Sequence, residues 1–333
     1  LAHGGDGIGR IDGQVCFVPY GLPGDVLLVR IMRRAKGVLW ASIVEVDAPS
    51  PDRREVTCPV YERCGGCAWL HFAYPAQAEW KQRIVRDQLK RLGGLDTEVE
   101  WMEDASLRMG YRTRAEFHGS RAGWGFHARQ SHEVVPIAEC PLCHPHLNAA
   151  LQRLRKVRDN GDVEVTVNPE GDDVLVWSRH PSNALLEEFP QYDFDPRAME
   201  RAMFLFDDVP VVNGTFTQGS LLLNRILRRI VWEMLDGAAN VLDLYCGNGN
   251  LTLGLPATCA SGATTTMARP FRRPRRCAPT PTTSATSAAF VSLLPAKRGT
   301  PSCSILRARA RRKSPPRWPR RRPRASCMSR ATR

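Results

Sequence analysis

The stretch Cys58-Pro59-Val60-Tyr61-Glu62-Arg63-Cys64-Gly65-Gly66-Cys67 places three cysteines within ten residues, and a fourth, Cys140, follows 73 positions after Cys67. The two glycines let the backbone fold tightly enough for neighbouring thiolates to face the same centre. Three close cysteines and a distant one are a pattern typical of proteins that hold a metal centre.

The four thiols are compatible with more than one metal. Thiolate ligands suit a [4Fe–4S] cluster, in which each iron takes one cysteine, and tetrahedral zinc uses ligands of the same kind. Uncoordinated thiols are the third interpretation. We favour the cluster, and the predicted ligands are Cys58, Cys64, Cys67 and Cys140.

The composition changes abruptly near residue 257. Residues 257–333 contain no Asp or Glu but hold 17 Arg and 2 Lys, so the net charge of +13 comes from this segment. Recurrent proline interrupts both helix and strand, which predicts disorder. One interpretation is an arginine-rich arm that binds RNA phosphate without sequence preference. The other, which the abrupt change favours, is a GC-rich gene read out of frame after about Leu255.

Residues 1–256 have the composition of a folded cytoplasmic protein. We find no charged-then-apolar signal peptide behind Leu1 and no apolar run of membrane-spanning length. Cysteines in the cytoplasm are kept reduced, which favours metal ligation over disulfides. The length suffices for two or three small domains.

Residues 1–48 predict a small closed barrel. Alternating strands are expected at 14–20, 26–31 and 37–46, with Gly and Pro in the turns between them. Gly5-Asp6-Gly7-Ile8-Gly9 and Phe17-Val18-Pro19-Tyr20-Gly21-Leu22-Pro23-Gly24-Asp25 resemble a TRAM domain, an OB-like RNA-binding barrel. A purely structural barrel is the alternative.

The middle of the chain alternates helix and strand signals. A helix is predicted over 76–92, ended by Gly93-Gly94, and strands over 111–137 and in a hairpin at 163–177. Interleaved Arg, His and aromatic residues in 111–127 could contact phosphates and stack on bases, or the aromatics could simply pack in a sheet. Residues 180–205 predict little, and a helix follows over 221–235.

The segment Val241-Leu242-Asp243-Leu244-Tyr245-Cys246-Gly247-Asn248-Gly249-Asn250 predicts a strand that ends in a glycine turn. In open parallel sheets, ligands bind at the carboxyl ends of strands, where glycine allows close approach. A lone G-x-G could be any tight turn, but the fuller text resembles motif I of class I methyltransferases, which bind S-adenosylmethionine. We therefore interpret Cys246 as part of a cofactor cradle rather than a catalytic thiol.

Together with Gly214-Thr215-Phe216-Thr217-Gln218, these motifs resemble the RNA uracil-C5 methyltransferases, particularly the iron–sulfur 23S ribosomal RNA type, over residues 1–255. The resemblance implies an RNA substrate and a cluster held by Cys58, Cys64, Cys67 and Cys140, although spacing alone does not exclude the neighbouring Cys143. It also implies that S-adenosylmethionine is held by Gln218, Asp243, Tyr245, Gly247, Gly249 and Asn250.

The family's chemistry needs residues that this sequence lacks. A cysteine thiolate adds to uracil C6, C5 then attacks the sulfonium methyl, and a base removes the C5 proton. These groups lie in a Ser-Cys-Asn/Asp-Pro segment and a later Glu, and the chain has neither, nor any carboxylate beyond Asp243. We expect no turnover. A non-catalytic RNA-binding iron–sulfur protein and, less favoured, a redox carrier are the alternatives.

The predicted fold class is α/β, in four parts. An OB-like TRAM barrel (1–48) is followed by a central α+β iron–sulfur domain (49–205), the start of a Rossmann-like methyltransferase domain (206–256) and a disordered tail (257–333). We expect a monomer that binds RNA and no membrane.

Overall fold

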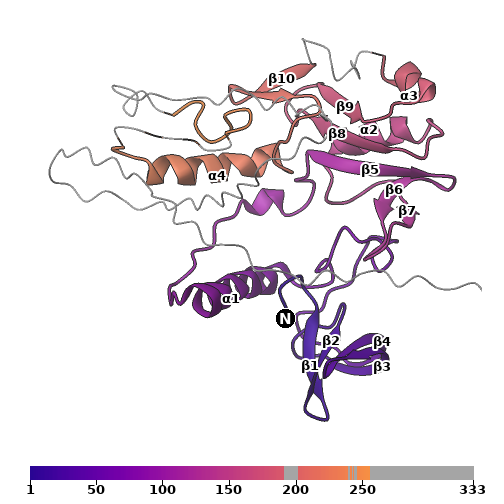
Figure 1. The fold of residues 1–333 in the computed structure, drawn as a ribbon, viewed down its shortest axis with the longest axis vertical. Coiled ribbons are helices and arrows are strands. Elements are labelled where there is room, and N and C mark those ends of the chain that lie inside the picture. Colours follow the sequence, from indigo (N-terminus) through magenta and orange to yellow (C-terminus); the bar gives the residue numbers. More distant parts are fainter. Residues whose placement is uncertain (191–201, 239–240, 242, 244–245, 256–333) are drawn as a thin grey trace, which may run out of the picture. The chain divides into compact units, whose positions relative to one another are not determined.

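The computed structural model describes residues 1–190, 202–238, 241, 243 and 246–255. The chain divides into two units, Leu1–Pro274 and Arg275–Arg333. The second unit, and with it the predicted disordered tail from residue 257, lies outside the described residues. The described part of the first unit is a mixture of helices and sheets, as the sequence predicted (Figure 1).

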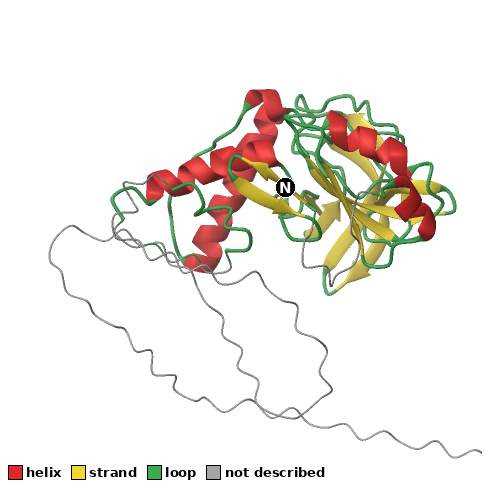
Figure 2. Cartoon of the chain, turned by 90° about the horizontal axis from the view of Figure 1, so that it is seen from above, coloured by secondary structure: helices red, strands yellow, loops and turns green. Residues whose placement is uncertain are grey.

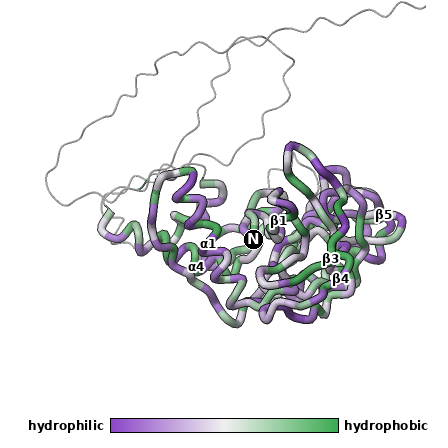
Figure 3. Tube along the Cα trace, turned by 90° about the horizontal axis from the view of Figure 1, so that it is seen from below, coloured by the Kyte–Doolittle hydropathy of each residue, from purple (hydrophilic) through white to green (hydrophobic). Residues whose placement is uncertain are grey.

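The first sheet contains β1 (Gly7–Ile11), β2 (Gln14–Val18), β3 (Val26–Ala35) and β4 (Val38–Ala48) in the order β1-β2-β4-β3. Both hairpins are antiparallel, and β2 pairs with β4 in parallel. Hydrophobic residues run along β3 and β4 (Figure 3), and Cys16, Val18, Leu39 and Ala41 form the core of this sheet. The predicted strands are confirmed, while closure into a barrel stays a prediction.

Helix α1 (Tyr74–Gly93) begins with a proline in its first turn and ends where Gly94 adopts a left-handed conformation, with φ of 66°. Glycine is favoured there because it has no Cβ. The predicted helix is confirmed. Its first turn packs through Ala76 with Leu22 and Phe72, which joins the helix to the loop between β2 and β3. A short 3-10 helix, η1 (Ala105–Leu107), follows.

The central sheet is antiparallel throughout. It contains β5 (Arg114–Ser120), β6 (Gly123–His127), β7 (Val134–Pro136), β8 (Asp162–Val167) and β9 (Val174–Ser178) in the order β7-β6-β5-β8-β9. Helices α2 (Pro145–Leu154) and α3 (Asn183–Glu188) lie against this sheet (Figure 2). Their leucines share the main core with Phe117, Val163 and Val165. Burial of these side chains is the principal force that holds the domain together.

The described chain ends with a hairpin, β10 (Met203–Phe206) and β11 (Val209–Val212), and with α4 (Leu221–Met234). The Ser220 side chain accepts a hydrogen bond from the backbone N–H of Leu223 and so caps the start of α4. The helix predicted over 221–235 is confirmed. Most of the strand predicted over 240–245 lies outside the described residues.

In the described part of the chain, no helix combines the length and the apolar character needed to cross a membrane.

Candidate metal centre and cofactor loop

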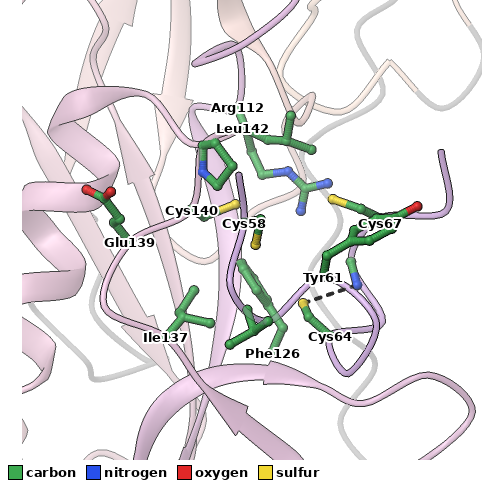
Figure 4. A pocket seen from close by; sticks show the side chains of 13 residues that line it. Cys58, Tyr61, Cys64, Cys67, Arg112, Phe126, Ile137, Glu139, Cys140 and Leu142 are labelled. Atoms are coloured by element: carbon green, nitrogen blue, oxygen red, sulfur yellow. Dashed lines mark hydrogen bonds between the residues drawn. The ribbon is translucent and has the colours of Figure 1, made fainter. Parts of the chain in front are cut away.

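One pocket collects the four cysteines that the sequence singled out. Cys58, Cys64, Cys67 and Cys140 line it together with Tyr61, Phe126 and Arg112. Figure 4 shows the sulfur atoms on the walls of a shared space, with the Arg112 guanidinium reaching toward Cys67. The structure therefore brings Cys140 to the three cysteines that precede it by more than seventy positions.

The loop from Cys58 to Cys67 is shaped by backbone hydrogen bonds. The N–H of Cys64 donates to the carbonyl of Val60 at 2.7 Å, and the N–H of Gly65 donates to the carbonyl of His127 at 2.9 Å. A Cβ at Gly65 would lie 2.9 Å from that same carbonyl oxygen, so only glycine fits without movement. The Gly66 N–H donates to the Cys64 sulfur at 3.4 Å. The tight fold expected of the two glycines is thus present.

Cys140 is placed by the connection from β7 to α2. Asn148 on α2 holds this connection, because its Oδ1 accepts from the Cys140 N–H at 2.9 Å and its Nδ2 donates to the Cys140 carbonyl at 3.1 Å. Arg112 is anchored beside it, since its N–H donates to the carbonyl of Leu142 at 2.8 Å. Arg112 was not predicted as a site residue; it enters the pocket through this contact with a distant loop.

The pocket affects its thiols differently. Burial raises the pKa of Cys64 and raises that of Cys67 to about 11. The pKa of Cys140 is lowered to about 6, chiefly because Cys143 donates a hydrogen bond to its sulfur, and the same bond raises the pKa of Cys143. Arg112 adds positive charge that lowers the pKa of Cys140. Of Cys64, Cys67, Cys140 and Cys143, Cys140 is thus the thiol most readily present as thiolate, the form that binds metals.

The structure distinguishes Cys140 from Cys143. Cys143 is 3% exposed and belongs to the core of the central domain, whereas Cys140 lines the pocket. Within the described residues, no three His, Cys, Asp or Glu side chains converge closely enough to hold a single metal ion. The four thiols surround a common space without meeting at one point.

A buried chain of polar contacts links the cysteine loop to the loop between β2 and β3. The Tyr61 hydroxyl lies 2.6 Å from His71 Nδ1, and His71 Nε2 lies 2.9 Å from the carbonyl of Tyr20. Near it, Arg53 forms an ion pair with Asp25, whose side chain is fully buried. Sequence reasoning missed this chain, because a histidine that bonds to a backbone carbonyl 51 positions away leaves no local motif.

The glycine turn of the predicted cofactor motif packs against α4. Asn250 and Asn224 form a closed amide pair, with N···O distances of 2.6 and 3.0 Å. Gly247 and Gly249 both have positive φ, 58° and 79°, as a turn of this kind requires. Asp243 accepts from the Thr252 hydroxyl at 2.8 Å.

The structure says less about the other two predicted cofactor residues, Gln218 and Tyr245. Gln218 is half-buried and precedes α4 by three positions, so it adjoins the helical turn that carries Asn224. Tyr245 lies outside the described residues.

The aromatic residues predicted either to stack on bases or to pack in a sheet are mostly core. Phe117 is 0% and Trp124 2% exposed, and the indole N–H of Trp124 donates to the carbonyl of Val157 at 2.7 Å. Phe216, by contrast, is 71% exposed, with the Arg114 guanidinium 5.5 Å from its ring centroid. The packing interpretation therefore holds for Phe117 and Trp124.

Comparison with known proteins identifies what the chain is similar to. Residues 1–44 match the TRAM domain. An uncharacterized RNA methyltransferase of Synechocystis sp. is 36% identical over 166 residues, 48% of this chain and 36% of that protein, and one of Gloeobacter violaceus is 38% identical over 164 residues, 47% and 36%. A further uncharacterized RNA methyltransferase, from Aquifex aeolicus, is 27% identical over 285 residues, 77% of this chain and 67% of that protein. The chain thus spans about a third of the length of the curated relatives it matches first.

A solved structure shares the fold. The crystal structure of Pyrococcus abyssi tRNA (uracil-54, C5)-methyltransferase in complex with S-adenosyl-L-homocysteine aligns with a TM-score of 0.53 and 24% identity, covering 74% of this chain and 69% of that one. The chain is therefore similar to TRAM-containing RNA methyltransferases, and these comparisons support the resemblance predicted from the sequence.

Proposed function

We propose that this chain is built for S-adenosylmethionine-dependent methylation of RNA at uridine C5, with 23S ribosomal RNA as substrate. Three findings support RNA methylation: the TRAM match, relatives named RNA methyltransferases, and a fold neighbour named as a tRNA uracil-C5 enzyme in complex with S-adenosyl-L-homocysteine. The choice of 23S ribosomal RNA rests on the sequence resemblance alone. In this proposal the protein acts in the cytoplasm as a monomer.

The observation that carries the proposal is the amide pair between Asn224 and Asn250. It holds the glycine turn against the helix that Gln218 precedes, so two segments that the family uses for the cofactor lie together. The proposed cofactor residues are Gln218, Asp243, Tyr245, Gly247, Gly249 and Asn250. When bound, S-adenosylmethionine supplies an electrophilic methyl group.

The same proposal assigns a [4Fe–4S] cluster to Cys58, Cys64, Cys67 and Cys140. The donor set fits, because four soft sulfur donors line one pocket. Tetrahedral zinc could use ligands of the same kind. The Arg112 guanidinium offsets part of the negative charge that the thiolates bring into the pocket.

The 333-residue polypeptide is proposed to lack turnover by itself, because no carboxylate follows Asp243 and the family's Ser-Cys-Asn/Asp-Pro segment is absent. The test uses the purified chain with S-adenosylmethionine carrying a labelled methyl group. We expect equilibrium dialysis to detect cofactor binding, and unmodified ribosomal RNA to gain no label. Label in the RNA would refute the loss of turnover, whereas absence of cofactor binding would refute the cofactor site.

A non-catalytic RNA-binding iron–sulfur protein is the second candidate, favoured by the same lack of carboxylates and by the arginine-rich segment 257–333. Deleting that segment should then weaken RNA binding and reduce its salt dependence. If RNA binding is unchanged by the deletion, residues 257–333 do not contribute to this candidate function.

A further inference from the structure

Helix α1 presents a basic surface beside the first sheet. It carries five basic residues and two acidic ones, and Ala76 is its only fully buried residue. The Arg83 guanidinium lies 4.7 Å from the centroid of the Trp80 ring. The basic residues are Lys81, Arg83, Arg86, Lys90 and Arg91.

The segment that follows α1 has the opposite charge. Residues 95–104, which we name the acidic strap, contain five acids and no basic residue: Asp96, Glu98, Glu100, Glu103 and Asp104. A positively charged helix is thus followed at once by a negatively charged segment.

The acidic strap runs back along the helix. Lys90 Nζ lies 2.7 Å from Asp96 Oδ2, and Arg86 lies 3.0 Å from Glu98. One turn earlier, Gln82 Nε2 donates to the carbonyl of Val99 at 2.7 Å. Successive residues of the acidic strap therefore contact residues progressively closer to the N-terminus of α1.

The acidic strap also covers the N-terminal half of α1. Lys81 Nζ lies 5.6 Å from the centroid of the Trp101 ring, and the Tyr74 ring centroid lies 6.5 Å from it. Trp101 and Val99 are half-buried, so they fix the strap, while its carboxylates remain exposed.

We infer that the acidic strap holds the basic side chains of α1 in the place of RNA phosphates, and that the backbone of a bound RNA displaces its carboxylates from Arg86 and Lys90. The inference rests on the proposed RNA substrate. It assigns α1 as an RNA-contacting surface and the strap as the element that limits its affinity.

The energetics permit this exchange. Exposed ion pairs contribute little to stability, so replacing a carboxylate by a phosphate costs little. The Arg and Lys side chains of α1 can pair with the phosphates of single-stranded RNA once the carboxylates of the acidic strap move away. Because Ala76 packs with Leu22, the first turn of α1 adjoins the residues that match the TRAM domain.

The test compares two substitutions of the same chemistry, Glu98→Gln and Glu100→Gln, in the full chain. Glu98 pairs with Arg86, whereas Glu100 is exposed and makes no ion pair among the described residues. Both remove one negative charge from the strap, and the arginine-rich segment is unchanged in each. A fluorescent single-stranded RNA oligonucleotide of mixed sequence serves as the probe, and melting temperatures confirm that the variants fold.

We expect Glu98→Gln to tighten RNA binding about two- to fivefold, in proportion to the usual strength of an exposed pair, and Glu100→Gln to have a smaller effect. Asp96 remains 3.9 Å from Arg86, so Glu98→Gln loosens the hold on this guanidinium without removing it entirely. The slope of log affinity against log salt should therefore steepen by up to about 0.7 for Glu98→Gln alone. Arg86→Gln should weaken RNA binding more in the Glu98→Gln variant than in the wild type. In the wild type the guanidinium of Arg86 is already paired with Glu98, so it contributes less to RNA binding.

Equal effects of Glu98→Gln and Glu100→Gln on affinity and salt slope would overturn the inference, because they would indicate only the change in net charge. Additivity of Arg86→Gln and Glu98→Gln would overturn it too. A wild-type chain that binds no RNA would instead refute the proposed function.

Discussion

The hydroxyl oxygen of Tyr61 lies 2.6 Å from Nδ1 of His71, and through this contact the loop that carries the cysteines is tied to the loop between β2 and β3. His71 Nε2 faces the carbonyl of Tyr20, an acceptor only, so Nε2 carries a ring proton, and burial disfavours a second proton on Nδ1. The Tyr61 hydroxyl has two acceptors within reach, His71 Nδ1 and the carbonyl of Ala68 at 3.0 Å. His71 is 4% exposed. A neutral imidazole therefore bridges the TRAM domain and the proposed metal centre.

This bridge predicts a pH dependence of stability. Burial, and then the positive charge of Arg53, lower the pKa of His71 from 6.5 to about 4. The unfolded chain takes up this proton near pH 6.5 and the folded chain only near pH 4, so the free energy of unfolding falls as pH decreases through that interval. We expect a loss on the order of 3 kcal/mol, measured by urea unfolding with the thiols reduced.

Two variants separate His71 from other titrating groups. His71→Gln removes the titration and should flatten the dependence of stability on pH over this interval. His180→Gln, at an exposed position, should leave the wild-type profile unchanged. If His71→Gln loses stability with acid as steeply as the wild type, another group is responsible.

Gly65 predicts a steric effect on the cysteine loop. A Cβ at this position would meet the carbonyl oxygen of His127 at 2.9 Å and the backbone nitrogen of Arg129 at 3.1 Å, neither of which can rotate away. We expect Gly65→Ala to lower the free energy of unfolding by about 1–3 kcal/mol, the usual cost of overpacking. Thermal unfolding measures this change.

Gly9 offers a matched control for this substitution, because a Cβ there would meet no atom within 4 Å. Gly9→Ala should therefore be nearly neutral. If both substitutions have equal effects, the close approach of Gly65 to β6 does not constrain the loop.

The sequence predicted those helices and strands that depend on a local pattern of residues. Alternation in β3, and the glycine that follows α1, were sufficient to find those elements. Helix α2 was missed, although Leu147, Leu151 and Leu154 repeat at helical spacing, because its N-cap is His144 rather than Ser, Thr, Asp or Asn.

In the candidate site, too, residues with a local pattern were predicted and residues with long-range partners were not. Spacing located Cys58, Cys64, Cys67 and Cys140, since cysteine is rare and its ligand patterns are distinctive. Arg112 and His71 escaped prediction because their partners, Leu142 and Tyr20, lie far along the chain. Long-range pairing of common residue types leaves no signature in a single sequence.

Cys140 and Cys143 predict opposite results in iron reconstitution. Cys140 lines the pocket and Cys143 lies in the core, so Cys140→Ala should abolish cluster assembly while Cys143→Ala should retain it. Iron content and visible absorption of the reconstituted chain measure both. Cys16→Ala, buried in the first sheet away from the pocket, controls for loss of a core thiol. Retention of iron in Cys140→Ala together with its loss in Cys143→Ala would make Cys143 the fourth ligand.

The amide pair between Asn224 and Asn250 predicts energetic coupling between α4 and the glycine turn. Each side chain satisfies the other's hydrogen-bonding groups, and Asn224 is 6% exposed, so removing one partner leaves the other amide poorly satisfied. Asn224→Ala and Asn250→Ala should each lower the free energy of unfolding by about 1–3 kcal/mol, and the double variant should lower it by less than their sum.

Hydrogen exchange of the backbone amides in residues 246–253 measures how readily the glycine turn opens. Because S-adenosylmethionine contacts the same turn in the proposed function, its binding should weaken in parallel with that opening. Exchange that is unchanged in all three variants would show that the turn is held by other contacts, of which the bond from the Trp232 indole N–H to the Leu251 carbonyl, at 2.8 Å, is the next to test.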